Sequence, residues 1–306
     1  MNETAASKSD TMMLCASCGI AGGVDDIKLM DCDGCDLVRY CSDACQEDHR
    51  PRHEEECKKR ADELLFKQPE SSHLGDCTIC FVPLPMDLSE STLYTCCSKL
   101  ICNGCSHANK ERETEGLMEQ KCPFCRKALP STKEERFRRM MKRVEAKDPV
   151  AMWRMGIERF REGNYEAAFE FFTNAAALGD LEAHYQLSIL YLDGLGVEKD
   201  EKKQLYHLIE ASIGGHPYAR NNLCCAEWKN GSIDRAVKHL IIAAKQGNDH
   251  SLEQVKRLFK AGCVSKEDFE AALRGHKAAI EATKSPQREK AAEALRKKAE
   301  RERRGL

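Results

Sequence analysis

The chain has 306 residues, with 48 Lys and Arg against 50 Asp and Glu, so its formal net charge is −2. This balance excludes a chain built wholly to coat nucleic acid, and the length allows about two domains, or small modules plus a repeat array. No apolar run approaches the ~18 residues of a membrane span. The polar start carries Glu3 and Asp10 and resembles neither a signal peptide nor a transit peptide. We therefore expect an intracellular protein of the cytoplasm, the nucleus or both.

Changes in composition along the chain predict seven segments. A polar, disordered start is followed by two cysteine clusters that a charged linker joins. A basic linker helix then leads into an array of short helices, and the chain ends in a charged helical tail. The predicted boundaries are 1–13 (disordered), 14–57 (first cluster), 58–75 (linker), 76–127 (second cluster), 128–147 (basic helix), 148–263 (helical array) and 264–306 (tail).

Cysteine is the most informative residue type. Of the 18 cysteines, 15 lie between Cys15 and Cys125. In a reducing compartment, dense cysteines indicate metal sites more often than disulfides. The two cluster segments are too small to fold on buried apolar surface alone, and structural zinc would supply on the order of 10 kcal/mol per site. The three later cysteines are Cys224, Cys225 and Cys263.

The first cluster holds eight candidate ligands, which is the number that two tetrahedral zinc ions need. Their spacings are C-x2-C, C-x2-C, C-x3-C and H-x3-C. A tight turn places both thiolates of a C-x2-C pair on one face, and Gly19 and Gly34 stand where such turns favour glycine. The ligands are Cys15, Cys18, Cys32, Cys35, Cys41, Cys45, His53 and Cys57.

The stretch RYCSDACQEDHRPRHEEEC resembles the second half of the MYND zinc finger. The resemblance implies interleaved ligand pairing, with one zinc on Cys15, Cys18, Cys41 and Cys45 and the other on Cys32, Cys35, His53 and Cys57. Arg50 stands where the family usually has a Trp that helps to form a groove for proline-rich peptides. Zinc binding is therefore expected, and peptide binding stays open. The matching residues are Tyr40, Cys41, Ser42, Cys45, Gln46, His49, His53 and Cys57.

The second cluster, with DCTIC, TCCSKLICNGC and KCPFCR, resembles a RING finger. The family's cross-brace implies one zinc on Cys77, Cys80, Cys102 and Cys105. The other zinc would take Cys122, Cys125 and two ligands from the middle loop.

The middle loop departs from the usual RING pattern. Counting back from Cys102 puts Cys97 at the usual cysteine position and Lys99 at the usual histidine position. A protonated lysine cannot bind zinc. Cys96 is the simplest replacement and His107 is the alternative, so the two clusters together predict four zinc ions per chain.

RING fingers act as ubiquitin ligases because they bind a charged ubiquitin-conjugating enzyme and hold its ubiquitin in a reactive pose, without a covalent intermediate. The resemblance implies that Ile79 packs on that enzyme and that Pro123 lines the same groove. Arg126 would hydrogen-bond both enzyme and ubiquitin, for which a planar guanidinium is suited. The same residues also occur in fingers that only bind proteins.

Small residues and glycines recur through the helical array. The small residues are 32, 36 and 32 positions apart, and the glycines are 36 and 32 apart. This period predicts a solenoid of antiparallel helix pairs, with the glycines in left-handed conformation after each second helix. The positions are Ala151, Ala183, Ala219 and Ser251, and Gly179, Gly215 and Gly247.

Residues 148–263 resemble Sel-one-like repeats, a tetratricopeptide-related family. Ser188 replaces a usual Gly in the second repeat, the first and third repeats turn at Gly163 and Gly231, and the fourth, from Asn248, is degenerate and expected to cap the stack. The second repeat matches the family pattern at Ala183, Leu187, Tyr191, Gly194, Gly196 and Val197.

Aromatic side chains of the array are expected to pack in the core and between repeats, and Cys224 and Cys225 to be buried as small hydrophobes. In the tail, Pro286 follows Ser285 and predicts a helix start, leading to an exposed helix or a short coiled coil. The aromatic residues are Trp153, Phe160, Phe169, Phe172, Tyr185, Tyr191, Tyr206 and Trp228.

The sequence thus predicts a mainly α fold, a helix-pair solenoid preceded by two small zinc-stapled modules. One functional hypothesis is a RING-type ubiquitin ligase with a conjugating enzyme and a substrate as partners. A second is a non-catalytic adaptor that joins proteins. A third, nucleic-acid binding by the basic runs 136–147 and 284–304, is the weakest, because these runs mix Glu with Lys and Arg and lack interleaved aromatics.

Overall fold

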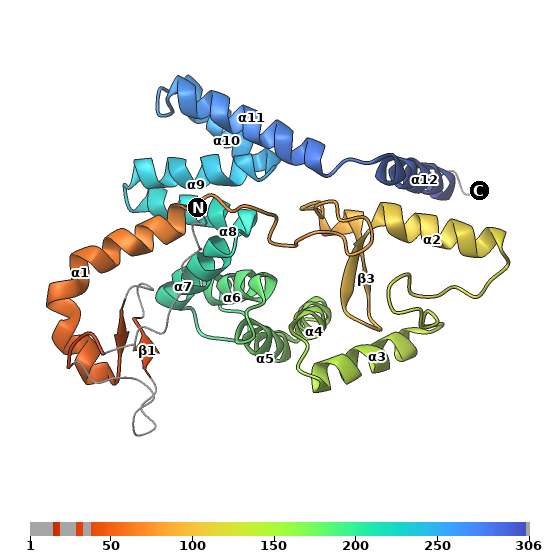
Figure 1. Ribbon diagram of the computed structural model, residues 1–306, viewed down its shortest axis with the longest axis horizontal. Coiled ribbons are helices and arrows are strands. Elements are labelled where there is room, and N and C mark those ends of the chain that lie inside the picture. Colours follow the sequence, from red (N-terminus) through yellow and green to blue (C-terminus); the bar gives the residue numbers. More distant parts are fainter. Residues whose placement is uncertain (1–14, 19–28, 33–37, 304–306) are drawn as a thin grey trace, which may run out of the picture. The chain divides into compact units, whose positions relative to one another are not determined.

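The computed structural model describes residues 15–18, 29–32 and 38–303, and the segment 1–13 that was expected to be disordered lies outside them (Figure 1). Residues 1–67 and 68–306 are two compact units, and each is described by itself. Within the described residues, no helix combines the length and the apolar character needed to cross a membrane.

The first unit contains a short hairpin and a long helix. Strand β1 (Met30–Asp31) pairs antiparallel with β2 (Arg39–Tyr40), and α1 spans Asp43–Phe66. The hydroxyl of Ser42 caps α1 by accepting a hydrogen bond from the backbone N–H of Cys45 at 3.3 Å. The beginning of the predicted linker 58–75 is helical, because residues 58–66 are good helix formers without Gly or Pro and continue α1.

The segment of the second cysteine cluster, residues 76–127 and called the second finger below, contains a hairpin followed by a helix. A 3-10 turn, η1 (Leu88–Glu90), leads into β3 (Ser91–Tyr94), which pairs antiparallel with β4 (Lys99–Cys102). Helix α2 (Asn103–Glu115) follows at once, and the Cys102 sulfur caps it by accepting from the backbone N–H of Cys105 at 3.4 Å. A predicted zinc ligand therefore also fixes the start of a helix.

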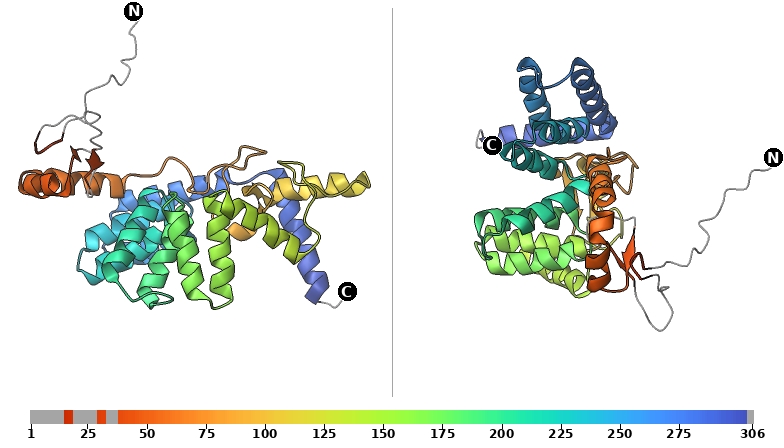
Figure 2. Two further views of the ribbon diagram at one scale, coloured as in Figure 1. Left: turned by 90° about the horizontal axis from the view of Figure 1, so that it is seen from below. Right: turned by 90° about the vertical axis from the view of Figure 1, so that its left-hand side faces the viewer.

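The rest of the second unit is helical, as the sequence predicts. Helix α3 (Lys133–Glu145) lies in the predicted basic linker helix and precedes the array. Successive helices of the array pack side by side (Figure 2). They are α4 (Pro149–Arg161), α5 (Tyr165–Ala176), α6 (Leu181–Asp193), α7 (Glu201–Ile213), α8 (Pro217–Lys229), α9 (Ile233–Lys245), α10 (Asp249–Lys260) and α11 (Lys266–Ala282).

Short polar side chains begin the helices and glycines follow their ends. Asp148 and Asp180 cap α4 and α6 by accepting hydrogen bonds from backbone N–H groups of the first turn. Gly179, Gly215 and Gly247 have φ angles of 82°, 92° and 95°. The left-handed conformation predicted for these glycines is confirmed.

The fourth repeat is more complete than predicted, because α11 is its second helix rather than part of a tail. Phe259 of α10 stacks on Phe269 of α11 with ring centroids 4.2 Å apart, and Ala272 is fully buried. The helical packing therefore continues past residue 263, where the sequence analysis placed the end of the array. The apolar face of α11 is hard to recognise because charged residues surround it in the sequence.

The tail helix α12 (Pro286–Arg303) begins at the predicted proline. It is not simply exposed, because Ala291 is buried and the helix packs on α2. The prediction of an exposed helix or a short coiled coil was therefore wrong for the face of α12 that carries Ala291.

The core of the array mostly follows the prediction. Six of the eight aromatic side chains are buried or partly buried, but Tyr206 and Trp228 are 55% and 45% exposed. Tyr206 lies two residues from buried Leu208 and so on the other side of α7. Cys224 is buried as expected, whereas Cys225, one position further around the helix, is exposed.

At Gly196, close packing of the backbone leaves no room for a larger residue. Its φ is +67°, and an added Cβ would lie 2.4 Å from the carbonyl carbon of Tyr165. Left-handed backbone alone costs a non-glycine residue about 1–2 kcal/mol, and overpacking adds about 1–3 kcal/mol. We expect Gly196→Ala to lower the free energy of unfolding by about 3 kcal/mol in urea titrations.

The matched control is Gly163→Ala, because Gly163 has φ +78° with nothing within 4 Å of an added Cβ. This control should lose only the backbone part, about 1 kcal/mol. Equal losses for the two variants would contradict the packing explanation.

Candidate metal centres

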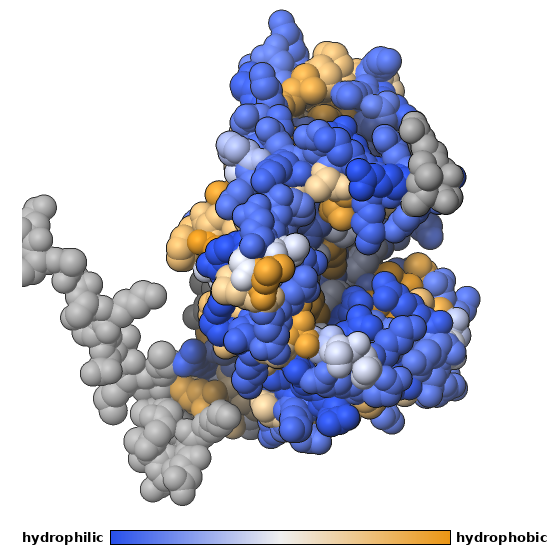
Figure 3. Space-filling view, turned by 90° about the vertical axis from the view of Figure 1, so that its right-hand side faces the viewer, coloured by the Kyte–Doolittle hydropathy of each residue, from blue (hydrophilic) through white to orange (hydrophobic). Residues whose placement is uncertain are grey.

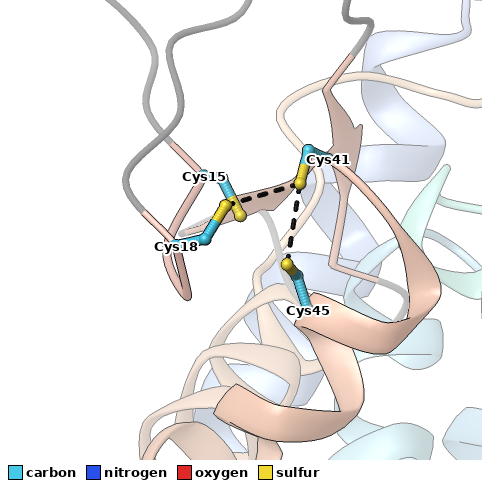
Figure 4. A group of neighbouring side chains, drawn as sticks. All are labelled: Cys15, Cys18, Cys41 and Cys45. Carbon is cyan, nitrogen blue, oxygen red and sulfur yellow. Dashed lines mark hydrogen bonds between the residues drawn. The ribbon is translucent and has the colours of Figure 1, made fainter.

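One group of the first finger brings four cysteines together (Figure 4). Cys18 and Cys45 each lie 3.6 Å from Cys41, measured between sulfurs. A tetrahedron with zinc–sulfur bonds of about 2.3 Å has sulfurs about 3.8 Å apart, so this spacing fits a zinc ion. The group is Cys15, Cys18, Cys41 and Cys45, with all sulfurs within 4.8 Å of one another.

The protonation behaviour of this group also fits a cation. Burial raises the pKa of Cys15, but backbone N–H groups, first that of Cys18, bring it down to about 6. The Cys41 thiol donates a hydrogen bond to the Cys45 sulfur and shares another with Cys18, and these bonds hold the pKa of Cys41 up at about 12. Without a cation the group therefore supports one thiolate and keeps a neighbouring thiol protonated. A bound divalent cation would supply the charge that lets all four ionise.

The second group of the first finger contains Cys32, His53 and Cys57, whose ligand atoms lie within 4.8 Å of one another. The sulfurs of Cys32 and Cys57 are 3.8 Å apart. His53 is buried on α1, four residues before Cys57, so both side chains project from one helical face. The fourth predicted ligand, Cys35, lies outside the described residues.

The second finger brings its eight cysteines into two interleaved groups. Each group takes cysteines from two separate stretches of the chain, with sulfur distances of 3.8 Å for Cys80–Cys102 and for Cys97–Cys122. The first group is Cys77, Cys80, Cys102 and Cys105, and the second is Cys96, Cys97, Cys122 and Cys125.

The middle loop places Cys96 within the second group, with its sulfur 3.3 Å from that of Cys125. The alternative ligand His107 lies elsewhere, with Nδ1 3.3 Å from a carboxylate oxygen of Glu111. Lys99 lies on β4, and its ammonium is 5.5 Å from the centre of the Phe124 ring. The geometry therefore favours Cys96 over His107 as the fourth donor.

Each of the two groups contains one knuckle turn of the same construction. In CTICF the backbone N–H of Phe81 donates to the carbonyl of Cys77, and in CPFCR that of Arg126 donates to the carbonyl of Cys122, both at 2.9 Å. Phe81 and Arg126 have φ angles of 55° and 60°. Burial raises the pKa of Cys77, but backbone N–H groups, first that of Cys80, bring it down to about 7. Each turn therefore aims N–H groups at sulfur.

The candidate contacts for a conjugating enzyme lie on these two knuckles. Ile79 is 38% exposed, and Pro123 is half-buried on the other knuckle. The guanidinium of Arg126 is half-exposed and lies 3.5 Å from Asn109 and 3.8 Å from the buried carboxylate of Glu113. Phe81 and Phe124 on the same two knuckles are 78% and 46% exposed. The face of the molecule in Figure 3 is mostly hydrophilic, with apolar residues in small separate groups.

A further group, which the sequence analysis missed, joins His73, Glu182 and His216. His73 Nε2 and His216 Nε2 lie 3.0 and 3.4 Å from one carboxylate oxygen of Glu182, and both imidazoles are almost fully buried. His73 follows the first finger in sequence, while Glu182 begins α6 and His216 caps α8. No spacing in the sequence signals this group, because its members come from three distant stretches.

The hydrogen bonds of His216 indicate whether this group binds a metal or only links parts of the chain. His216 Nδ1 accepts from the backbone N–H of Ala219 at 3.2 Å. A neutral imidazole with an accepting Nδ1 carries its hydrogen on Nε2, which can then donate to Glu182 but cannot bind a metal. Burial lowers the pKa of His216 and favours that neutral form. The group is therefore a hydrogen-bonded clasp that fixes the chain at His73 to the repeats.

A cavity of about 810 Å³ lies beside this clasp within the second unit. Its walls include Pro69 and His73, the half-exposed Tyr218 at the start of α8, and Ile280 near the end of α11. The volume falls within the roughly 300–1,000 Å³ of ligand pockets.

The clasp should contribute stability through the carboxylate of Glu182. Burial raises the pKa of this carboxyl, but hydrogen bonds from His216 and His73 bring it from 4.5 to about 2. A pKa lowered this far corresponds to about 3 kcal/mol of stability. That contribution is complete above about pH 4.5 and is lost as the pH falls toward 2. We expect Glu182→Gln to lower the unfolding free energy by about 3 kcal/mol equally at pH 6.5 and 8.5.

The control is Glu201→Gln, which removes an exposed carboxylate from the first turn of α7 and should cost well under 1 kcal/mol. A loss at Glu182 that shrinks as the pH rises from 6.5 to 8.5 would mean charged imidazolium partners and would contradict the neutral clasp.

Residues 15–57 match the family described as MYND finger, residues 120–230 match Plant tetratrico peptide repeats, and residues 229–248 match Sel1 repeat. These matched stretches do not include residues 77–105. The RING resemblance therefore rests on the cysteine motifs of the sequence and not on a family match. A search of curated proteins found no match.

Two solved structures are similar to parts of the chain. A Sel1 repeat protein from Oxalobacter formigenes is 24% identical with a TM-score of 0.44, over 50% of this chain and 66% of that one. The antigen c5321 of uropathogenic Escherichia coli, with an SLR fold, is 21% identical with a TM-score of 0.40, over 55% of this chain and 37% of that one. The chain thus spans less than two thirds of either structure. From its family matches, it combines a MYND-type zinc finger with tetratricopeptide-related Sel1 repeats.

Proposed function

We propose that this chain is a zinc-binding protein-interaction protein that acts as a RING-type ubiquitin ligase, with its helical repeats recruiting substrate or partner proteins. The observation that carries the proposal is the interleaving of the eight cysteines of the second finger into two groups. Two interleaved tetrahedral sites form the cross-brace of RING fingers, and a finger of this kind is a rigid platform for another protein.

The four groups would hold four zinc ions, two in each finger. In the first finger, Cys35 would complete the group of Cys32, His53 and Cys57. Zinc would contribute no redox chemistry there and would act by fixing the fold. The sulfur spacings near the tetrahedral edge and the mutual effects of neighbouring thiols on pKa support this assignment.

Native mass spectrometry of protein purified without chelators should count these ions. We expect four zinc ions per chain, and three for Cys97→Ser, which would remove one thiolate from a single group. Cys263→Ser is the matched control, because Cys263 is exposed and belongs to no metal group among the described residues. A count of two or fewer in the wild type would mean that one finger is misassigned.

The proposed catalysis is positioning rather than covalent chemistry. Ile79 and Pro123 would form the apolar contact with a conjugating enzyme. Arg126 would bridge that enzyme and its ubiquitin, because a planar guanidinium can donate to two acceptors at once. The left-handed knuckle at Arg126 and the nearby carboxylate of Glu113 hold this guanidinium at the finger surface. A lysine of the substrate could then attack the thioester, releasing the enzyme's thiol.

The repeats would supply the partner. Arrays of this kind bind proteins through extended surfaces, and the cavity beside Tyr218 offers a place for an extended segment of a partner. It lies in the same unit as the second finger.

Ubiquitination assays with a panel of conjugating enzymes test the ligase directly. We expect Ile79→Ala and Arg126→Ala each to slow ubiquitin transfer by about tenfold or more, because losing about 1.4 kcal/mol of a positioning contact has that effect. Ile213→Ala and Arg138→Ala are the matched controls, since Ile213 is similarly exposed, at 40%, and Arg138 is exposed on α3. Both controls should transfer ubiquitin at the wild-type rate.

Absence of transfer by zinc-loaded wild type with every enzyme of the panel would reject the ligase. Wild-type rates for both Ile79→Ala and Arg126→Ala would reject the assigned contacts.

The alternative is a non-catalytic adaptor that assembles protein complexes through the fingers and repeats. Arg126 favours this reading because it already lies near Asn109 and Glu113 and can serve the finger's own stability. Under the adaptor function, Arg126→Ala would lower the melting temperature of the finger, and the zinc-loaded wild type would transfer no ubiquitin.

A further inference from the structure

The carboxy-terminal helix α12 contacts the second finger at its first cysteine group. The key side chain is Arg288, in the first turn of the helix. One of its terminal nitrogens donates to the carbonyls of Pro83 and Thr283, each at 2.7 Å. The other donates to the carbonyl of Val82 at 3.0 Å and lies 3.9 Å from the sulfur of Cys80. Arg288 therefore holds the loop that follows Cys80 from a position more than two hundred residues later in the chain.

Further contacts bring the first turns of α12 close to α2. An added Cβ at Gly104 would lie 2.8 Å from the backbone nitrogen of Arg288, so a glycine is needed for this approach. Lys290 pairs with Glu111 at 2.8 Å, and Ala291 is 1% exposed. These contacts fix α12 in one register on α2.

Gln287 lies against a second cysteine of the same group, with its side-chain amide 3.9 Å from the sulfur of Cys105. With Cys105 as a thiol, the amide oxygen faces the sulfur. With a thiolate, rotation of the amide would turn its NH₂ group toward the sulfur, since the two orientations have the same shape. Two residues of the first turn of α12 therefore reach zinc-ligand candidates.

The charge of the cysteine group determines how strongly it attracts the start of α12. Four thiolates around one divalent cation carry a net charge of −2. Hydrogen-bond donors and positive charge beside such a site stabilise its thiolates and orient them. Arg288 brings a guanidinium, and the amino-terminal end of α12 adds the positive end of a helix dipole. The loaded site should therefore attract the start of α12 more strongly than four neutral thiols would.

We propose that α12 is a functional part of the second finger, in which Arg288 is a positioning residue for Cys80, and that metal retention by Cys77, Cys80, Cys102 and Cys105 is coupled to the docking of α12. This inference rests on the proposed zinc site. Coupling of this kind is reciprocal. Displacement of α12 loosens this metal site, and loss of its metal releases α12. The group of Cys96, Cys97, Cys122 and Cys125 is the internal reference, since the contacts of α12 described above reach only the other group.

The test measures zinc release from the full chain. After native mass spectrometry has established the starting zinc content, a chromogenic chelator follows release over time. We expect Arg288→Ala to release one zinc per chain about 10–100-fold faster than wild type, because loss of a partner behind a metal ligand costs about that factor in affinity. The other ions should leave at wild-type rates. Arg296→Ala is the matched control, because it removes an exposed arginine from the same helix.

Arg288→Lys keeps the charge without the planar fork and should lie between wild type and Arg288→Ala, which keeps the test usable if the alanine variant folds poorly. Hydrogen exchange provides a second readout. Backbone amides of 286–303 should lose protection in Cys80→Ser, which removes a ligand of the coupled group, and should keep it in Cys97→Ser, which removes one from the reference group.

Release of every zinc at the wild-type rate from Arg288→Ala, or unchanged protection of α12 after metal removal, would overturn the coupling and leave the zinc assignment intact. A wild-type chain without zinc in the second finger would instead remove the proposed function on which the coupling rests.

Discussion

The crowding of sulfur atoms is the physical constraint on which both fingers depend. Sulfurs approach to between 3.3 and 3.8 Å in the four groups, which is close to the edge of a zinc–thiolate tetrahedron. Burial and neighbouring thiolates raise the pKa of Cys96, Cys97 and Cys105, so these groups cannot all ionise without a compensating cation. A bound cation would replace the mutual repulsion of the thiolates with strong metal–sulfur bonds, and the short hairpins and helix starts lie around these groups.

Polar contacts connect the finger of the second unit to later parts of the same unit. The clasp of His73, Glu182 and His216 fixes the chain just before the finger to α6 and α8. Arg288 fixes the far end of the chain to the loop after Cys80. Both contacts pair charged or polar groups that are at least partly buried, and an unpaired buried charge is costly. The Nε of Arg288 remains buried without a hydrogen-bond partner among the described residues. The finger is thereby held at the chain just before it and at its own loop after Cys80, and a cavity lies beside both contacts.

Much of this arrangement follows from local rules. The spacings predicted the C-x2-C pairs, because a short turn leaves few geometries for two thiolates. Which pairs come together was implied by the resemblance to MYND and RING fingers, and the structure brings these cysteines together in the same groups. The left-handed glycines after the second helices were predicted as well, since each meets a backbone requirement of its own helix end. The second helix of the fourth repeat was missed because Phe269 and Ala272 lie among charged residues.

Contacts between distant stretches could not be read from the sequence. His73 is 109 residues from Glu182, and Arg288 is 208 residues from Cys80. No period or spacing links such positions, and their side chains are ordinary surface residues by composition. Their roles appear only when the solenoid brings α8, α11 and α12 back to the start of the second unit.

The central claim is that cysteine thiolates of the amino-terminal third hold zinc in tetrahedral sites. X-ray absorption at the zinc edge of the purified full chain tests it most directly, because it reports the atoms bound to the metal. The account predicts a first shell dominated by sulfur at about 2.3 Å, with a minor nitrogen contribution from His53. A shell dominated by oxygen and nitrogen, or a folded chain without zinc, would contradict it.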